Sequence, residues 1–190
     1  MAKKKRVIIL TDGDQTAYRA LSEACHDLQC HPLTASEGNP TPLSGSALVE
    51  RVLKAPKEPV VVMVDDRGEA GLGRGERALD VLINSPDIEV LGVVAVAANT
   101  HPVEGVDVTE SVDQNGEVVA EAVDKDGHRV SGHTLKGDTV DVLRGFAGTI
   151  VGLGDPGKME GHDAVGRGVP ATRRALEEIL QKGGGDHAHR

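Results

Sequence analysis

One stretch decides the fold class of this chain: VVVMVDD, residues Val60–Asp66. Five consecutive apolar residues followed by two acids predict a strand that is buried on both faces and ends at the carboxylates. Three further apolar runs, at 6–10, 88–98 and 147–153, have the same character. Segments with helical spacing separate these runs, and such an alternation is typical of a parallel sheet covered by helices. We therefore expect a three-layer, mostly parallel, doubly wound α/β fold.

The helix boundaries follow from capping residues, prolines and glycines. We expect helices over Gln15–Leu28 with Asp14 as N-cap, from Ser44 or Ser46 to near Pro56, over Glu76–Asn84, and over Pro170–Lys182. A weak strand is expected at 31–35 and a short helix at 137–143. Together these elements predict a single domain over residues 6–182, flanked by a basic arm at 1–5 and a flexible tail at 183–190.

The alternation of strands and helices stops between residues 101 and 136. This region contains Asn115-Gly116 and, eleven residues later, Asp126-Gly127, each flanked by residues that favour strands. Asn-Gly and Asp-Gly pairs favour tight hairpin turns, because both positions tolerate a positive φ. We expect an antiparallel β-meander here, inserted at the edge of the sheet.

Charge and composition exclude several classes of protein. The 190 residues carry a net charge of −9, and −13 without the four basic residues of Lys3–Arg6, so the body of the protein repels nucleic acid. Aromatic residues make up only 1%, which predicts an aliphatic core and no platform for stacking bases. The basic arm can contact an anionic membrane, or it is simply a solubilising flank. No apolar run approaches the ~20 residues of a spanning helix.

Two cysteines, Cys25 and Cys30, provide no disulfide framework, and we expect a reduced, cytosolic protein. The neighbouring His26 and His31 make the group look like a zinc site. On a helix, however, only His26 and Cys30 would share a face, and no second cluster supplies further ligands. Zinc is therefore not expected.

Five acids follow predicted strands and are the candidate metal ligands: Asp12, Asp14, Asp65, Asp66 and Asp155. Because the carboxyl ends of parallel strands meet at one edge of a sheet, these side chains should converge, and Asn99 should join them. Converging carboxylates repel each other unless a cation or basic side chains stand between them. Their hard oxygens suit Mg²⁺ or Ca²⁺. The alternative is that each acid only caps the helix that follows it.

A glycine-rich stretch lies between the strand at 60–64 and the next helix. Backbone N–H groups at a helix N-terminus bind anions, and arginines can add charge-assisted contacts. The candidate ligand-binding residues are Arg67, Gly71, Gly73, Arg74 and Gly75. The alternative is a loop that contacts no ligand.

Two enzyme families share parts of this pattern. The sequence DGDQT at Asp12–Thr16 resembles the first motif of haloacid-dehalogenase-type phosphatases, in which the first Asp is the nucleophile. The chain departs from that family because no strand ending in Ser or Thr separates this motif from Asp65-Asp66. The acidic edge also resembles that of toprim-like domains, which bind Mg²⁺ with acids at strand ends, although those have Glu at the position of Asp12.

A more extensive resemblance rests on several stretches that occur in order. They are Val7–Asp14, Gly38–Gly45, Val62–Arg67, Gly73–Leu79, Asp87–Ala97, Gly137–Leu143 and Gly152–Met159. Together they resemble the stage V sporulation protein AE family of endospore-forming Firmicutes, over about residues 5–182. The resemblance implies a soluble protein of the gene cluster that moves dipicolinic acid into the forespore and releases it in germination. It also implies a cytoplasmic place in the forespore, peripheral to the spore inner membrane, with membrane proteins of that cluster as partners.

Two hypotheses about function follow. The first is a non-enzymatic accessory protein of sporulation and germination, as the resemblance implies. The second is a Mg²⁺-dependent phosphoryl-transfer or hydrolytic enzyme that uses the acidic edge. The resemblance carries over no catalytic residue, and the sequence sets neither the cofactor nor the oligomeric state.

Overall fold

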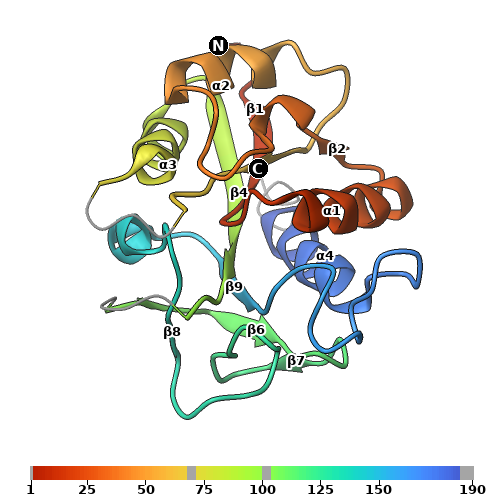
Figure 1. The fold of residues 1–190 in the computed structure, drawn as a ribbon. Helices are drawn as coiled ribbons and strands as arrows, with labels where there is room; N and C mark the ends of the chain where they lie inside the picture. The colour runs from red at the N-terminus through yellow and green to blue at the C-terminus, as the bar shows by residue number, and fades with distance from the viewer. Residues whose placement is uncertain (1, 68–71, 100–103, 185–190) are drawn as a thin grey trace.

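A computed structural model describes residues 2–67, 72–99 and 104–184 of the chain (Figure 1). Its main sheet has the strand order β2-β3-β1-β4-β9-β6-β7, and every neighbouring pair is parallel except β6 and β7. The strands in that order are β2 (His31–Pro32), β3 (Val60–Met63), β1 (Lys5–Leu10), β4 (Ile88–Val96), β9 (Ile150–Leu153), β6 (Glu110–Val112) and β7 (Val118–Val119). The four predicted strands are thus confirmed as neighbours in one parallel sheet.

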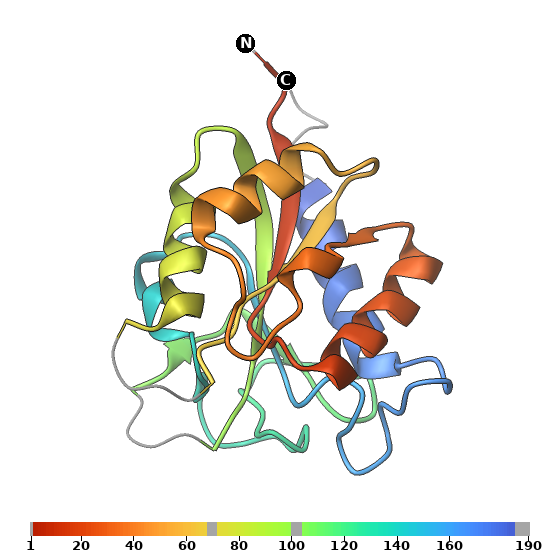
Figure 2. The ribbon, with the colours of Figure 1, turned by 45° about the horizontal axis from the view of Figure 1, so that its top comes forward.

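Helices cover both faces of this sheet (Figure 2). On one face lie α2 (Gly45–Leu53) and α3 (Arg74–Asn84), and on the other lie α1 (Gln15–Leu28) and α4 (Pro170–Gly184). The described part of the chain also contains two 3₁₀ turns, η1 (Thr34–Ser36) and η2 (Asp141–Gly145). The predicted three-layer arrangement is confirmed. The short helix expected at 137–143 is replaced by the 3₁₀ turn η2, which begins four residues later.

The core consists of two aliphatic layers, one on each side of the sheet. Alternate residues of β1 enter different layers: Val7 and Ile9 pack under α2 and α3, whereas Ile8 and Leu10 pack under α1 and α4. All four are essentially inaccessible to solvent. A strand buried on both faces has to be apolar at every position, which explains the continuous apolar runs of the sequence.

The helix ends follow local capping chemistry. The side chain of Asp14 accepts a hydrogen bond of 2.7 Å from the Ala17 N–H group, so α1 begins and ends where the sequence predicts. Ser44 caps α2 in the same way. Helix α3 begins at Arg74, two residues earlier than expected, because a distant side chain caps it, as described below.

The insertion contains both predicted turns. Gly116 and Gly127 have φ of +78° and +81°, and each turn closes with a hydrogen bond to the carbonyl of an aspartate three residues earlier. The first turn joins the antiparallel pair β6 and β7. The expectation of a simple meander is nevertheless wrong in part. Strand β6 pairs in parallel with β9 and extends the main sheet, while β5 (Val106–Asp107) and β8 (Thr134–Leu135) form a separate antiparallel pair. Residues 101–103 of the expected meander lie outside the described residues.

The expectation of reduced cysteines is contradicted, because the structure joins Cys25 and Cys30 by a disulfide. Cys25 lies in the last turn of α1, and Gln29 ends the helix in a left-handed conformation with φ of +59°. That residue reverses the chain, so that the Cys30 N–H group bonds the Cys25 carbonyl and the two Cα atoms lie 4.6 Å apart. Cys30 lies beyond the helix end, so it does not share a helical face with His26 as expected.

Candidate functional site

An acidic cleft of about 280 Å³ opens at the carboxyl edge of the sheet. Four of the five predicted acids line it: Asp12 and Asp14 after β1, Asp65 after β3, and Asp155 after β9. They are accompanied by Arg67, by Lys158 from the loop after β9, and by Asn39, Asp138 and the end of β4. The parallel sheet therefore produces the convergence that the strand ends predict.

Asp65 is held by hydrogen bonds from its own segment and from two distant segments, those of Gly13 and Thr41. Its carboxylate accepts hydrogen bonds from the N–H groups of Gly13, at 3.0 Å, and Arg67, at 2.8 Å. The Thr41 hydroxyl accepts a hydrogen bond of 2.8 Å from the Asp65 N–H group. Gly13 has no room for a side chain, since a Cβ atom there would lie 2.0 Å from the Gly38 carbonyl oxygen. Segments far apart in the chain thus meet around Asp65.

Asp12 and Asp14 have different roles although they are two residues apart. Asp14 caps α1 and also forms an ion pair of 3.3 Å with Lys158, which brings the loop after β9 against the start of the helix. The carboxylate of Asp12 accepts one hydrogen bond, of 3.1 Å, from the Asp14 N–H group. The capping alternative is therefore right for Asp14 and does not describe Asp12.

The electrostatics of the cleft favour neutral carboxyl groups. Burial, reinforced by the charge of Asp14, raises the pKa of Asp12 to about 7. Burial also raises the pKa of Asp65 and of Asp155, although N–H groups oppose the shift at Asp65 and Lys158 opposes it at Asp155. The pKa of Lys158 is raised too, because its pairing with Asp14 outweighs the opposite effect of burial. Concentrated negative charge is thus only partly balanced by the cations in the cleft.

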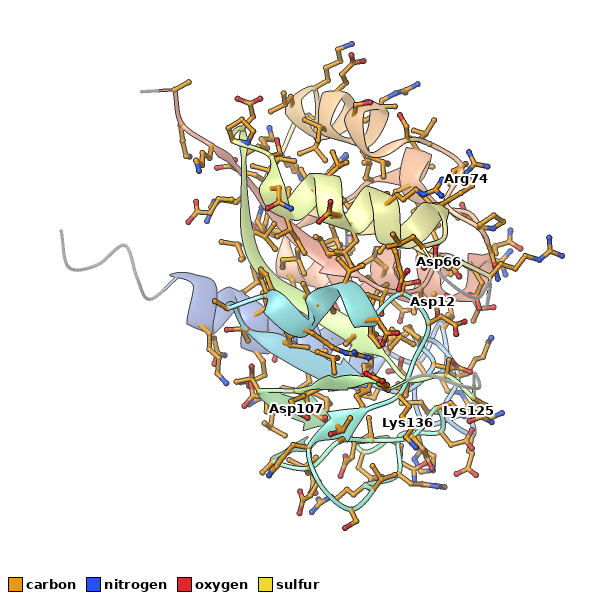
Figure 3. All side chains as sticks on the ribbon, turned by 90° about the vertical axis from the view of Figure 1, so that its left-hand side faces the viewer. Asp12, Asp66, Arg74, Asp107, Lys125 and Lys136 are labelled. Carbon is orange, nitrogen blue, oxygen red and sulfur yellow. A yellow bond between two sulfur atoms is a disulfide. The ribbon has the colours of Figure 1, made fainter. Side chains whose placement is uncertain are left out.

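Asp66, the fifth predicted metal ligand, does not line the cleft. Its Oδ1 atom accepts hydrogen bonds from the N–H groups of Gly75, at 2.6 Å, and Glu76, at 3.1 Å, so it caps α3 from a distance in sequence. Figure 3 shows its label between those of Asp12 and Arg74. For Asp66 the capping alternative is correct, because successive residues after a strand point in different directions.

The same contact changes the interpretation of the glycine-rich stretch. Its helix N-terminus already binds an anion, the Asp66 carboxylate. Gly73 and Gly75 permit this close approach, since a Cβ atom on Gly73 would lie 2.2 Å from Asp66 Oδ1 and one on Gly75 would lie 2.6 Å from the Asp65 backbone. Arg74 donates to the Pro42 carbonyl at 3.1 Å instead of lining the cleft, and Gly71 lies outside the described residues. Of the predicted ligand-binding set, Arg67 is the member that the structure places in the cleft.

Three residues of the cleft, Lys158, Asn39 and Asp138, are not predicted from the sequence. They belong to stretches that resemble the sporulation family, Gly152–Met159, Gly38–Gly45 and Gly137–Leu143, but none of these stretches has a local motif for binding. Asn99, in contrast, was expected at the acidic edge and lines a different pocket. Among residues 2–67, 72–99 and 104–184, no three His, Cys, Asp or Glu side chains are arranged so that they alone could hold a metal ion. Any cation in the cleft would have to gain oxygen ligands from elsewhere.

Comparisons with known proteins provide one match, which covers almost the whole chain. The model of the stage V sporulation protein AE1 family matches residues 6–183. Searches of curated proteins and of solved structures gave no significant match. None of the helices in the described part of the chain is long and apolar enough to span a membrane. On the strength of a match over residues 6–183, the chain belongs to the stage V sporulation protein AE1 family.

Proposed function

We propose that this sporulation protein is a non-enzymatic accessory protein of sporulation and spore germination whose acidic cleft binds a divalent cation together with a small dicarboxylate. The observation that carries the proposal is the meeting of five carboxylates, those of Asp12, Asp14, Asp65, Asp138 and Asp155, with Arg67 and Lys158 in one cleft. Membership in the family suggests calcium dipicolinate as the ligand. It also suggests that the protein works at the spore inner membrane, beside membrane proteins encoded in the same gene cluster.

The cleft contains both acidic and basic side chains, so it suits a ligand that carries positive and negative charge together. Ca²⁺ takes six to eight oxygen ligands, more than the scattered carboxylates supply by themselves. A dicarboxylate chelated to the ion would contribute the missing oxygens. The carboxylate oxygens that point away from the ion would then face Arg67 and Lys158, and the cation would face Asp12, Asp65 and Asp155.

Calorimetry on the full chain tests this proposal with three titrants: Ca²⁺ alone, dipicolinate alone and the equimolar mixture. We expect the mixture to bind more tightly than either component. Asp12→Asn and Asp155→Asn should weaken binding of the mixture by about tenfold each, the loss of one charged contact in a partly buried site. Asp87→Asn is the matched control, because Asp87 is an exposed acid outside the cleft. Equal heats for the mixture and for dipicolinate alone would contradict the proposal.

One observation favours an enzyme as the second candidate. A carboxyl group with a pKa of about 7 in a cleft, as at Asp12, is suited to general acid–base catalysis near neutral pH. A toprim-like assignment of the fold belongs to this candidate, since such domains use acids at strand ends to bind Mg²⁺. Phosphate-ester substrates should be tested with and without Mg²⁺. Turnover that needs Mg²⁺ and is lost in Asp12→Asn would establish this second candidate in place of the first.

A further inference from the structure

A second pocket lies beside the acidic cleft and has a different chemistry. Its volume is about 430 Å³, within the usual range for small-molecule sites. It is formed by the residues that follow β4, the turn around Lys125 and the segment 130–136, and it shares Ala97 and Ala98 with the cleft. In Figure 3, Lys125 and Lys136 lie on the side of the insertion, below Asp12.

One wall of this pocket is apolar and firmly held, while Asn99, Ser131 and Thr134 contribute polar groups elsewhere in the lining. Ala97 and Val123 are buried, and Val130 is half-buried. The Val130 N–H group bonds the Ala122 carbonyl at 2.9 Å, and the Ala98 N–H group bonds the Lys136 carbonyl at 3.0 Å. These backbone bonds tie the pocket wall to β4 and to the antiparallel part of the insertion. The pocket is therefore preformed and does not need to be assembled by a ligand.

Two ammonium groups border this apolar wall. Neither Lys125 nor Lys136 forms an ion pair or a side-chain hydrogen bond with any residue in the described ranges, whereas Lys158 in the neighbouring cleft is paired with Asp14. The one acid of the pocket, Asp124, is already engaged, because its Oδ1 atom accepts hydrogen bonds from the N–H groups of Asp126 and His128. In a protein with a net charge of −9, two such lysines beside an apolar wall indicate a site for an anion.

Lys125 also connects the pocket to the cleft. Its carbonyl accepts a hydrogen bond of 2.7 Å from the Asp155 N–H group. Its ammonium group is close enough to oppose the rise in the pKa of Asp155. An anion held by Lys125 would therefore lie next to any cation held by Asp155.

We propose that this pocket binds a small carboxylate with an apolar body. The carboxylate would accept hydrogen bonds from the ammonium groups of Lys125 and Lys136. The apolar body would lie against Val123, Val130 and Ala97 and remove their surface from water. This proposal goes beyond the cation site of the cleft and does not depend on it, because the lysines and the apolar wall are present without any cation.

The test is calorimetry on the full chain in buffer free of divalent cations, with benzoate as the probe. Acetate keeps the charge without the ring, and benzyl alcohol keeps the ring without the charge. We expect both to bind at least about tenfold more weakly than benzoate, since each lacks one of the two interactions. Equal binding of acetate, or stronger binding of inorganic phosphate than of benzoate, would overturn the proposed ligand class.

Substitutions of the two lysines test whether benzoate binds in this pocket. Lys125→Gln and Lys136→Gln should each weaken benzoate binding by about tenfold, whereas Lys54→Gln, the same change at an exposed lysine outside the pocket, should not. Thermal unfolding of each variant checks that the fold is intact. Asp12→Asn should leave benzoate binding unchanged even if it abolishes binding of a cation, so failure of one proposal is distinguishable from failure of the other. Undiminished benzoate binding in both lysine variants would overturn the assignment of the pocket.

Discussion

At the scale of single residues, the adjacent acids Asp65 and Asp66 have different roles. Asp65 faces the cleft and organises the segments around it, while Asp66 turns to the N-terminus of α3. Asp12 differs from both, because it lies in the cleft with one hydrogen bond from the backbone and a strongly raised pKa. Asp65 and Asp66 thus stabilise the fold, whereas the carboxyl group of Asp12 is available for function.

Asp12 should make stability depend on pH. Its pKa is about 7 in the folded protein and close to 3.8 in the unfolded chain, so between these values the folded state holds a proton that the unfolded state has released. The free energy of unfolding should therefore fall as pH rises from about 4 to 7, by at most about 4 kcal/mol. Asp65 and Asp155 add to this effect with the same sign. Urea unfolding at pH 5 and pH 8 measures it.

Asp12→Asn supplies the comparison for this prediction. The variant cannot ionise, so it should be more stable than the wild type at pH 8 and should lose most of the difference between the two pH values. Asp87→Asn should behave like the wild type, because the Asp87 side chain is exposed and lies outside the cleft. An unchanged pH dependence in Asp12→Asn would show that Asp12 is ionised throughout this range.

Asp66→Ala should act on stability without acting on the cleft. Removal of the carboxylate leaves the N–H groups of Gly75 and Glu76 without their acceptor. Loss of such a cap lowers the free energy of unfolding by about 1–2 kcal/mol. Asp66→Asn keeps an acceptor oxygen and relieves the repulsion that, after burial, raises the pKa of Glu76, so it should be much less harmful. Chemical unfolding of both variants measures the difference, and weaker Ca²⁺–dipicolinate binding by Asp66→Asn would contradict this purely structural role.

At the scale of elements, the end of α1 shows how one residue determines a covalent connection. Gln29 adopts a left-handed conformation, and the chain then returns to enter β2 at His31. The reversal brings Cys30 back to Cys25 and joins the helix end to the edge strand of the sheet.

We expect the disulfide between Cys25 and Cys30 to contribute to stability through the loop that it closes. For a loop this short, the entropy lost by the unfolded chain corresponds to about 2 kcal/mol, or about 4–8 °C in Tm for a domain of this size. Thermal unfolding with and without a reducing agent measures the effect. The double variant Cys25→Ser/Cys30→Ser should match the reduced wild type and should not respond to the reductant. A wild-type Tm that the reductant leaves unchanged would argue against the disulfide.

At the scale of the whole molecule, the basic arm is attached to an acidic body. Glu58 forms ion pairs with Lys3, at 2.8 Å, and with Arg6, at 3.3 Å, and the hydrogen bond from Lys3 is the main reason that the pKa of Glu58 is lowered. Lys5 donates to the Ala55 carbonyl and begins β1. The single carboxylate of Glu58 therefore compensates part of the positive charge that a membrane would attract.

Binding to anionic vesicles should consequently be weak in the wild type and stronger in Glu58→Gln. Each basic residue near an anionic surface contributes about 1 kcal/mol, so release of Lys3 and Arg6 should increase partitioning several-fold at low salt. Glu50→Gln is the control, because it removes one negative charge from an exposed position that does not contact the arm. Vesicle sedimentation measures the effect, and added salt should abolish it. Equal binding by the two variants would show that the arm does not act on the membrane.

Much of this molecule follows from local sequence. The apolar runs predict four parallel strands, because a strand covered by helices on both faces tolerates no polar residue. Asp14 and Ser44 set the starts of their helices, and the turns at Asn115-Gly116 and Asp126-Gly127 form because few residues other than Gly adopt a positive φ readily. The order of strands and helices even predicts that acids after the strands meet at one edge.

What only the tertiary structure decides is which partner each polar group finds. Nothing local distinguishes Asp65 from Asp66, yet their side chains leave the chain in different directions and meet different backbone segments. Lys158 contacts Asp14, which lies 144 positions away in the sequence. Strand β6 pairs in parallel with β9 and so joins the main sheet instead of forming part of a simple meander. Apolar burial depends on pattern and is therefore visible in sequence. Hydrogen bonds and ion pairs depend on direction and distance, and these exist only once the chain has folded.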